Sequence, residues 1–190
     1  MTKLYLVRHG PTNRKGLIGW TDVPVDLSET ARLKALNEHL PNLPVVSSDL
    51  KRASMTADGF AGQRRRLDHD NNLREFHFGD WEDKSVQEVE TAHPELAKNY
   101  WSEPGEHAPP NGESWDQGYM RMSNAIDGHL EEQGDIIIVC HMGVILTQIA
   151  RATEMPAQHA LSFKIDNYSV TTLERLKEPY WRVLGVNHIY

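Results

Sequence analysis

An uninterrupted apolar run from Ile136 to Cys140 is the feature that most constrains the fold of this chain. A strand with one face in solvent alternates apolar and polar residues, whereas a strand covered on both faces of a parallel sheet is apolar throughout. The run is far too short to cross a membrane and suits a buried strand. It therefore predicts the central strand of a parallel sheet, and His141-Met142-Gly143 then turns into a predicted helix from Val144 to about Ala152.

Strands and helices alternate along the rest of the chain. Leu4 to Val7 predicts a first strand and Val45-Val46 a second, with a helix from Ser28 between them. A helix from Leu50 to Phe60 follows the second strand, with Asp49 as its expected N-cap, because that carboxylate can accept an amide hydrogen bond from the first turn. This order is typical of an α/β protein.

Two capping-box patterns mark helix starts in the middle of the chain. Ser85 pairs with Glu88, and Ser114 pairs with Gln117. The second box opens a long predicted helix, which keeps one apolar face until Gly134 ends it.

The end of the chain predicts an antiparallel addition to the sheet. Segments Ser169 to Leu173 and Arg182 to Val186 flank a turn around Pro179 and have the pattern of a hairpin. The whole predicts an α/β fold with an open, mostly parallel sheet and helices on both faces, a three-layer sandwich. No linker or repeat interrupts the pattern, so we expect residues 1–190 to form a single domain.

Composition excludes several functional classes. The chain of 190 residues has a formal net charge of −7, which argues against nucleic acid as the main partner. No apolar stretch is long enough for a membrane span. The N-terminus enters a strand pattern directly, without the features of a secretory signal, and the lone Cys140 cannot form an internal disulfide. We therefore expect a cytoplasmic protein with no nucleic-acid or membrane partner, and a homodimer stays open.

Polar residues stand where the predicted strands end. Arg8 and His9 follow the first strand, Arg52 lies one turn into the helix after the second, and His141 follows the apolar strand. Glu75 comes shortly after another apolar point, at Leu73. Ligands of open parallel sheets bind beyond the carboxyl ends of the strands, so these side chains should gather at one edge.

That set of residue types suits phosphoryl transfer. The planar guanidinium of arginine matches phosphate oxygens in pairs and stays charged. Histidine can be neutral near pH 7, so that one ring nitrogen can attack while the other donates a hydrogen bond. The alternatives are purely structural roles. Arg8-His9 could form a surface turn, Arg52 could face solvent, and His141 could be a core histidine.

Five segments also resemble a known family in their order and spacing. They are LVRHGPT, SSDLKRASMTA, LREFHFGDWE, PPNGESW and VCHMG, and together they run from about Lys3 to Gly143. The chain is similar through them to the histidine phosphatase superfamily, which has the phosphoglycerate mutase-like fold. A single RHG triplet would be weak evidence, whereas five ordered segments are strong evidence.

The resemblance implies a role for each residue of the predicted edge. His9 is the expected nucleophile that becomes phosphohistidine, and Glu75 the expected proton donor to the leaving oxygen. Arg8, Arg52 and His141 are expected to bind the phosphoryl group. No cofactor and no metal is implied.

The run after Glu75 resembles the phosphatase branch, and most of all the α-ribazole phosphatases. Pro11 stands where the family usually has glutamate, and Met142 replaces a frequent glycine. Neither departure removes a catalytic group, but both leave the choice of substrate open. The expected partner is a small phosphorylated metabolite.

Other assignments near the site stay open. Asp70, Glu82 and Asp83 are alternative acids to Glu75. The substrate could also meet three further side chains, namely Thr12, Asn13 and His77. A group of Asp68, His69, Asp70 and His77 could suggest a metal site, although no ligand spacing there is diagnostic.

The sequence thus predicts a metal-independent phosphomonoesterase that acts through phosphohistidine. Three rivals remain: a phosphoglycerate-type mutase that shares the same groups, a non-catalytic phosphate-binding module, and a metallohydrolase built on residues 68–77.

Overall fold

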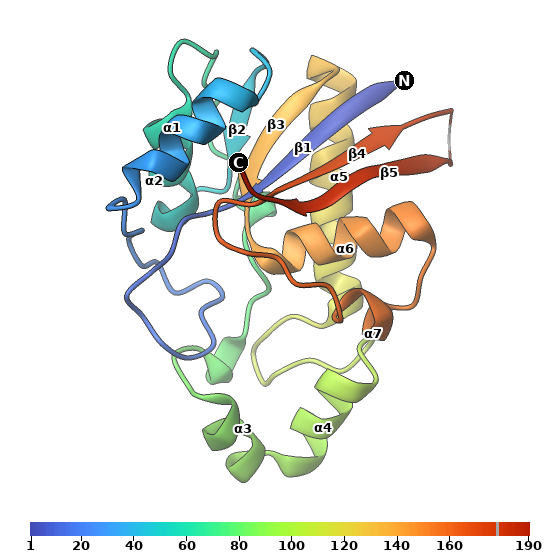
Figure 1. Cartoon of the computed structure of the whole chain (residues 1–190). Coiled ribbons are helices and arrows are strands. Elements are labelled where there is room, and N and C mark those ends of the chain that lie inside the picture. The colour runs from blue at the N-terminus through green and yellow to red at the C-terminus, as the bar shows by residue number, and fades with distance from the viewer. Residues whose placement is uncertain (178) are drawn as a thin grey trace.

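The computed structural model describes residues 1–177 and 179–190 and contains a five-stranded open sheet (Figure 1). Its strand order is β2-β3-β1-β4-β5. The first three of these strands are parallel, and the last two are antiparallel to their neighbours. The strands are β1 (Thr2–Arg8), β2 (Val45–Ser47), β3 (Ile136–Cys140), β4 (Val170–Arg175) and β5 (Trp181–His188).

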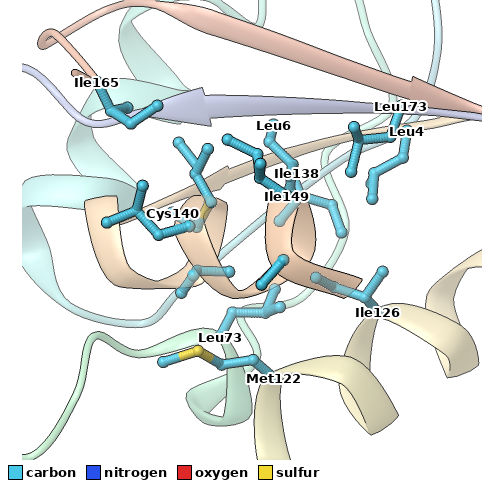
Figure 2. Close-up of a cluster of buried hydrophobic side chains, with 14 of the residues drawn as sticks. Leu4, Leu6, Leu73, Met122, Ile126, Ile138, Cys140, Ile149, Ile165 and Leu173 are labelled. Carbon is cyan, nitrogen blue, oxygen red and sulfur yellow. The ribbon is translucent and has the colours of Figure 1, made fainter. Parts of the chain in front are cut away.

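The apolar run is indeed the strand in the middle of the parallel part, between β2 and β1. All five of its side chains are buried, and they divide alternately between the two faces. Ile137 and Val139 pack in the cluster under one pair of helices, whereas Ile136, Ile138 and Cys140 belong to the cluster on the other face (Figure 2). This alternation explains why the run contains no polar residue.

Helices cover both faces of the sheet, as predicted. Helices α1 and α2 contribute to the cluster around Ile137 and Val139, and α5 and α6 to the cluster on the opposite face. The α-helices among the described residues are α1 (Thr30–His39), α2 (Lys51–Phe60), α3 (Val86–Ala92), α4 (Pro94–Ser102), α5 (Trp115–Gln133), α6 (Met142–Thr153) and α7 (Ala157–Ala160), and the 3-10 turns are η1 (Asn71–Leu73) and η2 (Gly79–Trp81).

Both capping boxes are present. The Ser85 hydroxyl accepts from the backbone N–H of Glu88, whose side chain accepts in return from the N–H of Ser85. Ser114 and Gln117 do the same at the start of α5. Each box satisfies helix-end donors that would otherwise have no intrahelical partner.

The N-cap predicted at Asp49 is wrong. Helix α2 begins at Lys51, and its N-cap residue Leu50 forms no side-chain cap. The N–H of Lys51 donates to Oδ1 of Asp22 at 2.7 Å. The Asp49 carboxylate accepts two hydrogen bonds from the guanidinium of Arg74. A two-pronged charged partner outcompetes a single amide of the helix, so Asp49 does not cap it.

The predicted C-terminal hairpin forms β4 and β5, and β4 pairs with β1. The sheet is therefore mixed. Its parallel strands β2, β3 and β1 end at the edge where the predicted site residues stand, and the antiparallel strands β4 and β5 extend the sheet beside β1. The turn around Pro179 includes residue 178, which lies outside the described residues. No described helix combines the length and apolar character that a membrane span requires.

Candidate active site

The parallel pairing of β1 with β3 brings the two histidines together. Arg8 pairs in register with Cys140, so that His9 and His141 emerge side by side beyond the strands. The N–H of His9 donates to the Cys140 carbonyl at 3.0 Å. The two imidazole rings lie with their centroids 5.1 Å apart and their planes inclined by 60°. Residues 132 positions apart in the chain thus meet at one edge of the sheet, as predicted from the rule that polar residues after parallel strands gather beyond the carboxyl ends of those strands. We call this the strand-end rule.

His9 is held in one orientation. Its Nδ1 lies 2.6 Å from the carbonyl oxygen of Gly10, an acceptor, so that Nδ1 carries the proton. Burial and the positive charge of Arg52 lower the pKa of His9 to about 3. The imidazole is therefore neutral near pH 7, and Nε2 keeps its lone pair.

The backbone next to His9 is fixed from three sides. The N–H of Gly10 donates to Oγ1 of Thr56 at 3.0 Å, and Nδ2 of Asn167 donates to the carbonyl of His9 at 2.8 Å. A Cβ on Gly10 would lie 2.3 Å from the hydroxyl oxygen of Tyr168. Glycine is therefore required here, because the phenol ring occupies the space that a side chain would need.

Two arginines provide the positive charge of the site. Arg8 donates from Nη1 to the carbonyl of Ile165. Arg52, which is 1% exposed, donates to the carbonyls of Thr21 at 3.0 Å and Gly19 at 2.6 Å. Burial lowers the pKa of both guanidiniums, but their ordinary pKa is so high that both stay charged.

The loop that holds Arg52 is itself organised by Glu82. This carboxylate accepts from the N–H groups of Gly19, Trp20 and Thr21 and from the Thr21 hydroxyl, at 2.6 to 3.1 Å. Glu82 was an alternative acid in the sequence, and the structure places it under this loop rather than in the wall of the cavity described below.

Glu75 is buried beside the histidines. Its Oε1 accepts from the N–H of Phe76 at 3.0 Å, and its Oε2 accepts from the N–H of Gly143 at 3.1 Å. Burial raises the pKa of this carboxyl group, although both amides and the nearby arginines oppose the rise. A carboxyl group with a raised pKa is suited to donate a proton near neutral pH.

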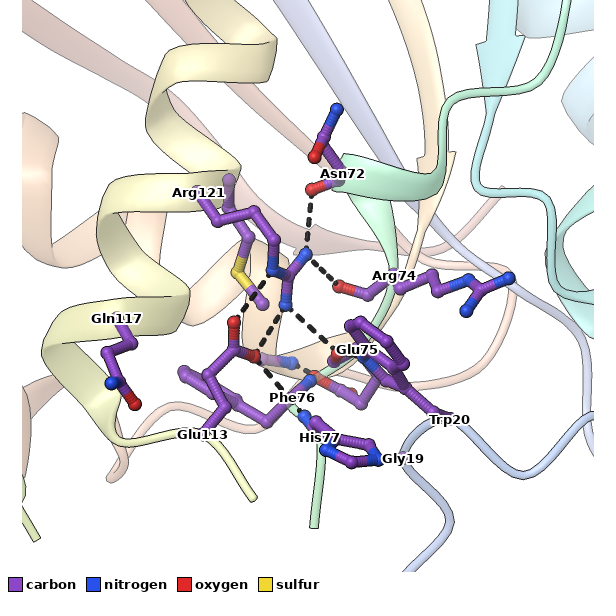
Figure 3. A network of polar contacts seen from close by, with 12 residues as sticks. Gly19, Trp20, Asn72, Arg74, Glu75, Phe76, His77, Glu113, Gln117 and Arg121 are labelled. Carbon is purple, nitrogen blue, oxygen red and sulfur yellow. Dashed lines mark hydrogen bonds and ion pairs between the residues drawn. The ribbon is translucent and has the colours of Figure 1, made fainter. Parts of the chain in front are cut away.

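A separate network fixes the backbone on which Glu75 stands (Figure 3). Arg121 of α5 forms a two-pronged ion pair with Glu113 and donates from Nη2 to the carbonyl of Glu75 at 3.1 Å. Nε1 of Trp20 donates to the same carbonyl at 2.8 Å. Glu113 and Arg121 were not predicted from the sequence, because their spacing of eight residues matches no local motif.

A cavity of about 250 Å³ opens onto this group. Its wall includes Arg8, His9, Thr12, Arg52 and Glu75, all of them predicted site residues. Six further members of the wall were not among the predicted site residues, namely Arg14, Gly16, Leu17, Ile18, Phe78 and Met142. Arg14 carries the signal of a cation close to the RHG triplet, and Met142 was noted only as a departure from the family's frequent glycine.

Three predicted residues do not line this cavity. Asn13 is exposed and faces a neighbouring hollow, and the ring of His77 lies against Trp20 with centroids 4.5 Å apart and planes inclined by 49°. His141 is completely buried next to His9, and neither of its ring nitrogens has a hydrogen-bond partner. Burial lowers its pKa well below the ordinary value, so the ring is neutral.

The other acidic and histidine residues near the site have separate partners. Asp70 accepts from His129 at 2.9 Å, and Asp83 accepts from Arg14 at 2.9 Å. His69 contacts Ser47 and Arg66. Within residues 1–177 and 179–190, no three His, Cys, Asp or Glu side chains are grouped to hold a metal ion.

Comparison with known proteins agrees with this geometry. The sequence matches the histidine phosphatase superfamily (branch 1) over residues 4–188. Adenosylcobalamin/alpha-ribazole phosphatase of Escherichia coli (strain K12) is 31% identical over 176 residues, which cover 86% of this chain and 85% of that protein. Phosphoglycerate mutase-like protein 4 of Arabidopsis thaliana is 32% identical over 197 residues, which cover 95% of this chain and 83% of that protein.

Solved structures share the same architecture. Bacillus stearothermophilus YhfR superposes with a TM-score of 0.87 and 29% identity, covering 100% of this chain and 98% of that chain. The mycobacterial glucosyl-3-phosphoglycerate phosphatase Rv2419c in complex with inorganic phosphate gives 0.83 and 26%, with coverages of 100% and 98%. The chain belongs to the histidine phosphatase superfamily. The predicted family and fold are therefore confirmed.

Proposed function

We propose that this phosphatase hydrolyses monoesters of small phosphorylated metabolites through a phosphohistidine at His9. The observation that carries the proposal is the group of side chains gathered beyond the carboxyl ends of the parallel strands. It combines a neutral histidine with a free Nε2, the buried guanidinium of Arg52, the partly buried guanidinium of Arg8 and a buried carboxyl group with a raised pKa, all in the wall of one cavity. Phosphatases among the relatives support the same reaction class.

The first step transfers the phosphoryl group to the enzyme. Nε2 of His9 attacks phosphorus as the bond from phosphorus to the ester oxygen breaks, and Glu75 gives its proton to the departing oxygen. The products are an alcohol, phosphohistidine and the Glu75 carboxylate. A covalent intermediate divides one difficult displacement into two easier ones.

The second step reverses these proton movements. The Glu75 carboxylate takes a proton from water as the water oxygen attacks phosphorus and the bond to Nε2 breaks. Inorganic phosphate leaves, and both His9 and Glu75 return to their starting states. One carboxyl group therefore acts as acid and then as base.

The arginines stabilise the charge that spreads over the phosphoryl oxygens in both steps. Arg8 and Arg52 are already held by backbone carbonyls, so little reorganisation is required when the phosphate binds. His141 is expected to donate a hydrogen bond to the same group from behind His9. Its unpartnered ring nitrogens support that role, which also requires the completely buried ring of His141 to become accessible to the phosphoryl group.

The decisive experiment replaces the nucleophile. His9→Ala should abolish hydrolysis of p-nitrophenyl phosphate in the presence of EDTA and should eliminate acid-labile phosphoenzyme in quenched mixtures. His188→Ala, which changes an exposed histidine on β5, is the matched control and should keep both signals. Wild-type turnover by His9→Ala would end the proposal, and loss of activity with EDTA in the unmutated protein would favour the metallohydrolase.

A mutase remains the second candidate, because Arg14 at the cavity could bind a substrate carboxylate. Product analysis with phosphoglycerates separates the two functions: interconversion of isomers without release of phosphate identifies a mutase. We place the reaction in the cytoplasm, since the buried lone Cys140 suits a reducing compartment.

A further inference from the structure

A second pocket adjoins the cavity of about 250 Å³, which we call the phosphate cavity, at Glu75. Glu75, Phe78 and Met142 line both spaces, so the two are direct neighbours. The second space has a volume of about 70 Å³. We call it the leaving-group pocket, and the remaining wall that the argument uses consists of Tyr100, Trp101, Trp115, Leu146 and Leu161.

Several residues of this wall lie outside the five segments that resemble the family. Tyr100 and Trp101 belong to α4, which Figure 1 places next to α7, and Leu161 follows α7 directly. The rings are already packed on one another. Tyr100 and Trp101 meet edge to face at 4.7 Å between centroids, and Phe76 stacks on Trp115 at 5.5 Å. The pocket is thus formed in advance of binding, which reduces the entropy lost when a ligand enters.

The position of Glu75 determines which part of a substrate would occupy this pocket. The phosphoryl group must lie against His9 and the arginines, and the ester oxygen must lie within reach of Glu75. A substrate held in this way has its ester carbon on the side of Glu75, where the leaving-group pocket adjoins the cavity. The organic part of the substrate, and not its phosphate, is what the aromatic wall contacts.

The chemistry of that wall is one-sided. Among the described residues that line it, Glu75 is the only charged side chain. Apart from Glu75, the polar side-chain groups of the wall are the hydroxyl of Tyr100 and the N–H groups of the two tryptophans. A sugar or a glycerate would therefore bury more hydroxyl or carboxylate oxygens there than these groups can match, which costs free energy. Arg14 lines the phosphate cavity and not the leaving-group pocket. Its Nε donates to Asp83 at 2.9 Å.

We propose that the leaving-group pocket selects phosphate monoesters of alcohols with a compact apolar or aromatic group, over sugar phosphates and phosphoglycerates. This inference rests on the proposed function, because it assigns the alcohol half of that same substrate. It adds the substrate class, which neither the family nor the phosphate cavity determines.

The test compares esters whose leaving alcohols differ in shape but little in acidity. The unmutated enzyme is assayed for phosphate release from 2-phenylethyl phosphate, ethyl phosphate, glycerol 3-phosphate and 3-phosphoglycerate. Burial of a ring is worth about ten-fold or more in binding, so kcat/KM for 2-phenylethyl phosphate should exceed each of the others at least ten-fold.

Two variants locate the effect. Leu161→Lys puts a charge at the exposed rim of the pocket and should abolish the preference, while the rate on ethyl phosphate is kept. Trp101→Ala removes part of the wall and should lower only the rate on the ring substrate. Leu184→Lys changes an equally exposed leucine on β5 and serves as the matched control.

The outcomes separate this inference from the proposed function. Equal or better hydrolysis of glycerol 3-phosphate or 3-phosphoglycerate would overturn the inference and leave the phosphatase intact. An unchanged preference in both Leu161→Lys and Trp101→Ala would overturn the assignment of the pocket. Absence of phosphate release from all four esters would instead contradict the proposed function.

Discussion

One added methyl group tests whether Glu75 is the proton donor. Gly143 lies at the start of α6, and a Cβ there would lie 2.1 Å from Oε1 of Glu75 and 2.6 Å from Cδ2 of Phe76. Real Cβ contacts essentially never fall below 3.0 Å, so in Gly143→Ala the carboxyl group must retreat by about 0.9 Å, the difference between 3.0 and 2.1 Å. The 3.1 Å hydrogen bond from the N–H of Gly143 to Oε2 is disturbed as well.

The expected loss follows from that displacement. A misplacement of about 1 Å can lower a rate by about 10²-fold, and general acid catalysis contributes about 10²- to 10⁴-fold. We therefore expect kcat for an alkyl phosphate to fall by about 10²-fold in Gly143→Ala. p-Nitrophenyl phosphate should lose much less, because its leaving group departs readily without a proton. Overpacking should also lower the free energy of unfolding by about 1–3 kcal/mol.

The assay measures steady-state kcat with both esters, after circular dichroism has shown that the variant is folded. Gly128→Ala is the matched control, since a Cβ there meets nothing within 4 Å and the residue lies inside α5. It should keep full activity and gain up to about 1 kcal/mol of stability from the better helix propensity of alanine. Equal losses on the two esters, or no loss on either, would refute the role of Glu75.

Four further predictions concern charge and hydrogen bonding in the site. The pKa values imply that kcat/KM rises with pH as His9 loses its proton near pH 3 and falls on the alkaline side as Glu75 ionises; a pH profile in which Glu75→Gln keeps the alkaline limb would contradict this assignment. The folded-state pKa of His9 is depressed, so protonation favours unfolding and the free energy of unfolding should decrease from about pH 6.5 towards pH 3 in denaturant titrations. Glu82→Gln weakens charge-assisted hydrogen bonds to the loop that holds Arg52, so inorganic phosphate should inhibit less strongly and the melting temperature should drop. His141→Ala should lower kcat by about 10²-fold if His141 supports the phosphoryl group, and a kcat equal to that of the unmutated protein would remove it from the mechanism.

The sequence predicted those features that follow from local pattern and from the strand-end rule. The run from Ile136 to Cys140 identified the central strand because burial on both faces excludes polar residues. The polar tips at His9 and His141 could be paired from the sequence alone, because parallel strands end at one edge. Both capping boxes were visible because each is closed within four residues.

Features that depend on distant partners were not predictable in the same way. Asp49 has a favourable position for an N-cap, but Arg74 binds it from 25 residues away. His77 lies two positions from Glu75, yet its ring lies against Trp20. Nothing in the sequence indicated that His141 would be completely buried, because the depth of a side chain depends on its neighbours in space.

The two halves of the proposed substrate site share part of their structural support. The phosphate cavity depends on the ends of β1 and β3, on α2, and on the network around Arg121. Tyr100 and Trp101 of the leaving-group pocket belong to α4, which packs with α3 through a hydrophobic cluster of its own. Phe76 and Trp115 of the same pocket belong instead to the cluster that packs on the sheet. Because only the α4 side of the pocket stands on a separate cluster, changes at Trp101 can alter the fit of the alcohol while the phosphoryl-transfer groups stay in place, whereas changes at Phe76 or Trp115 should disturb both.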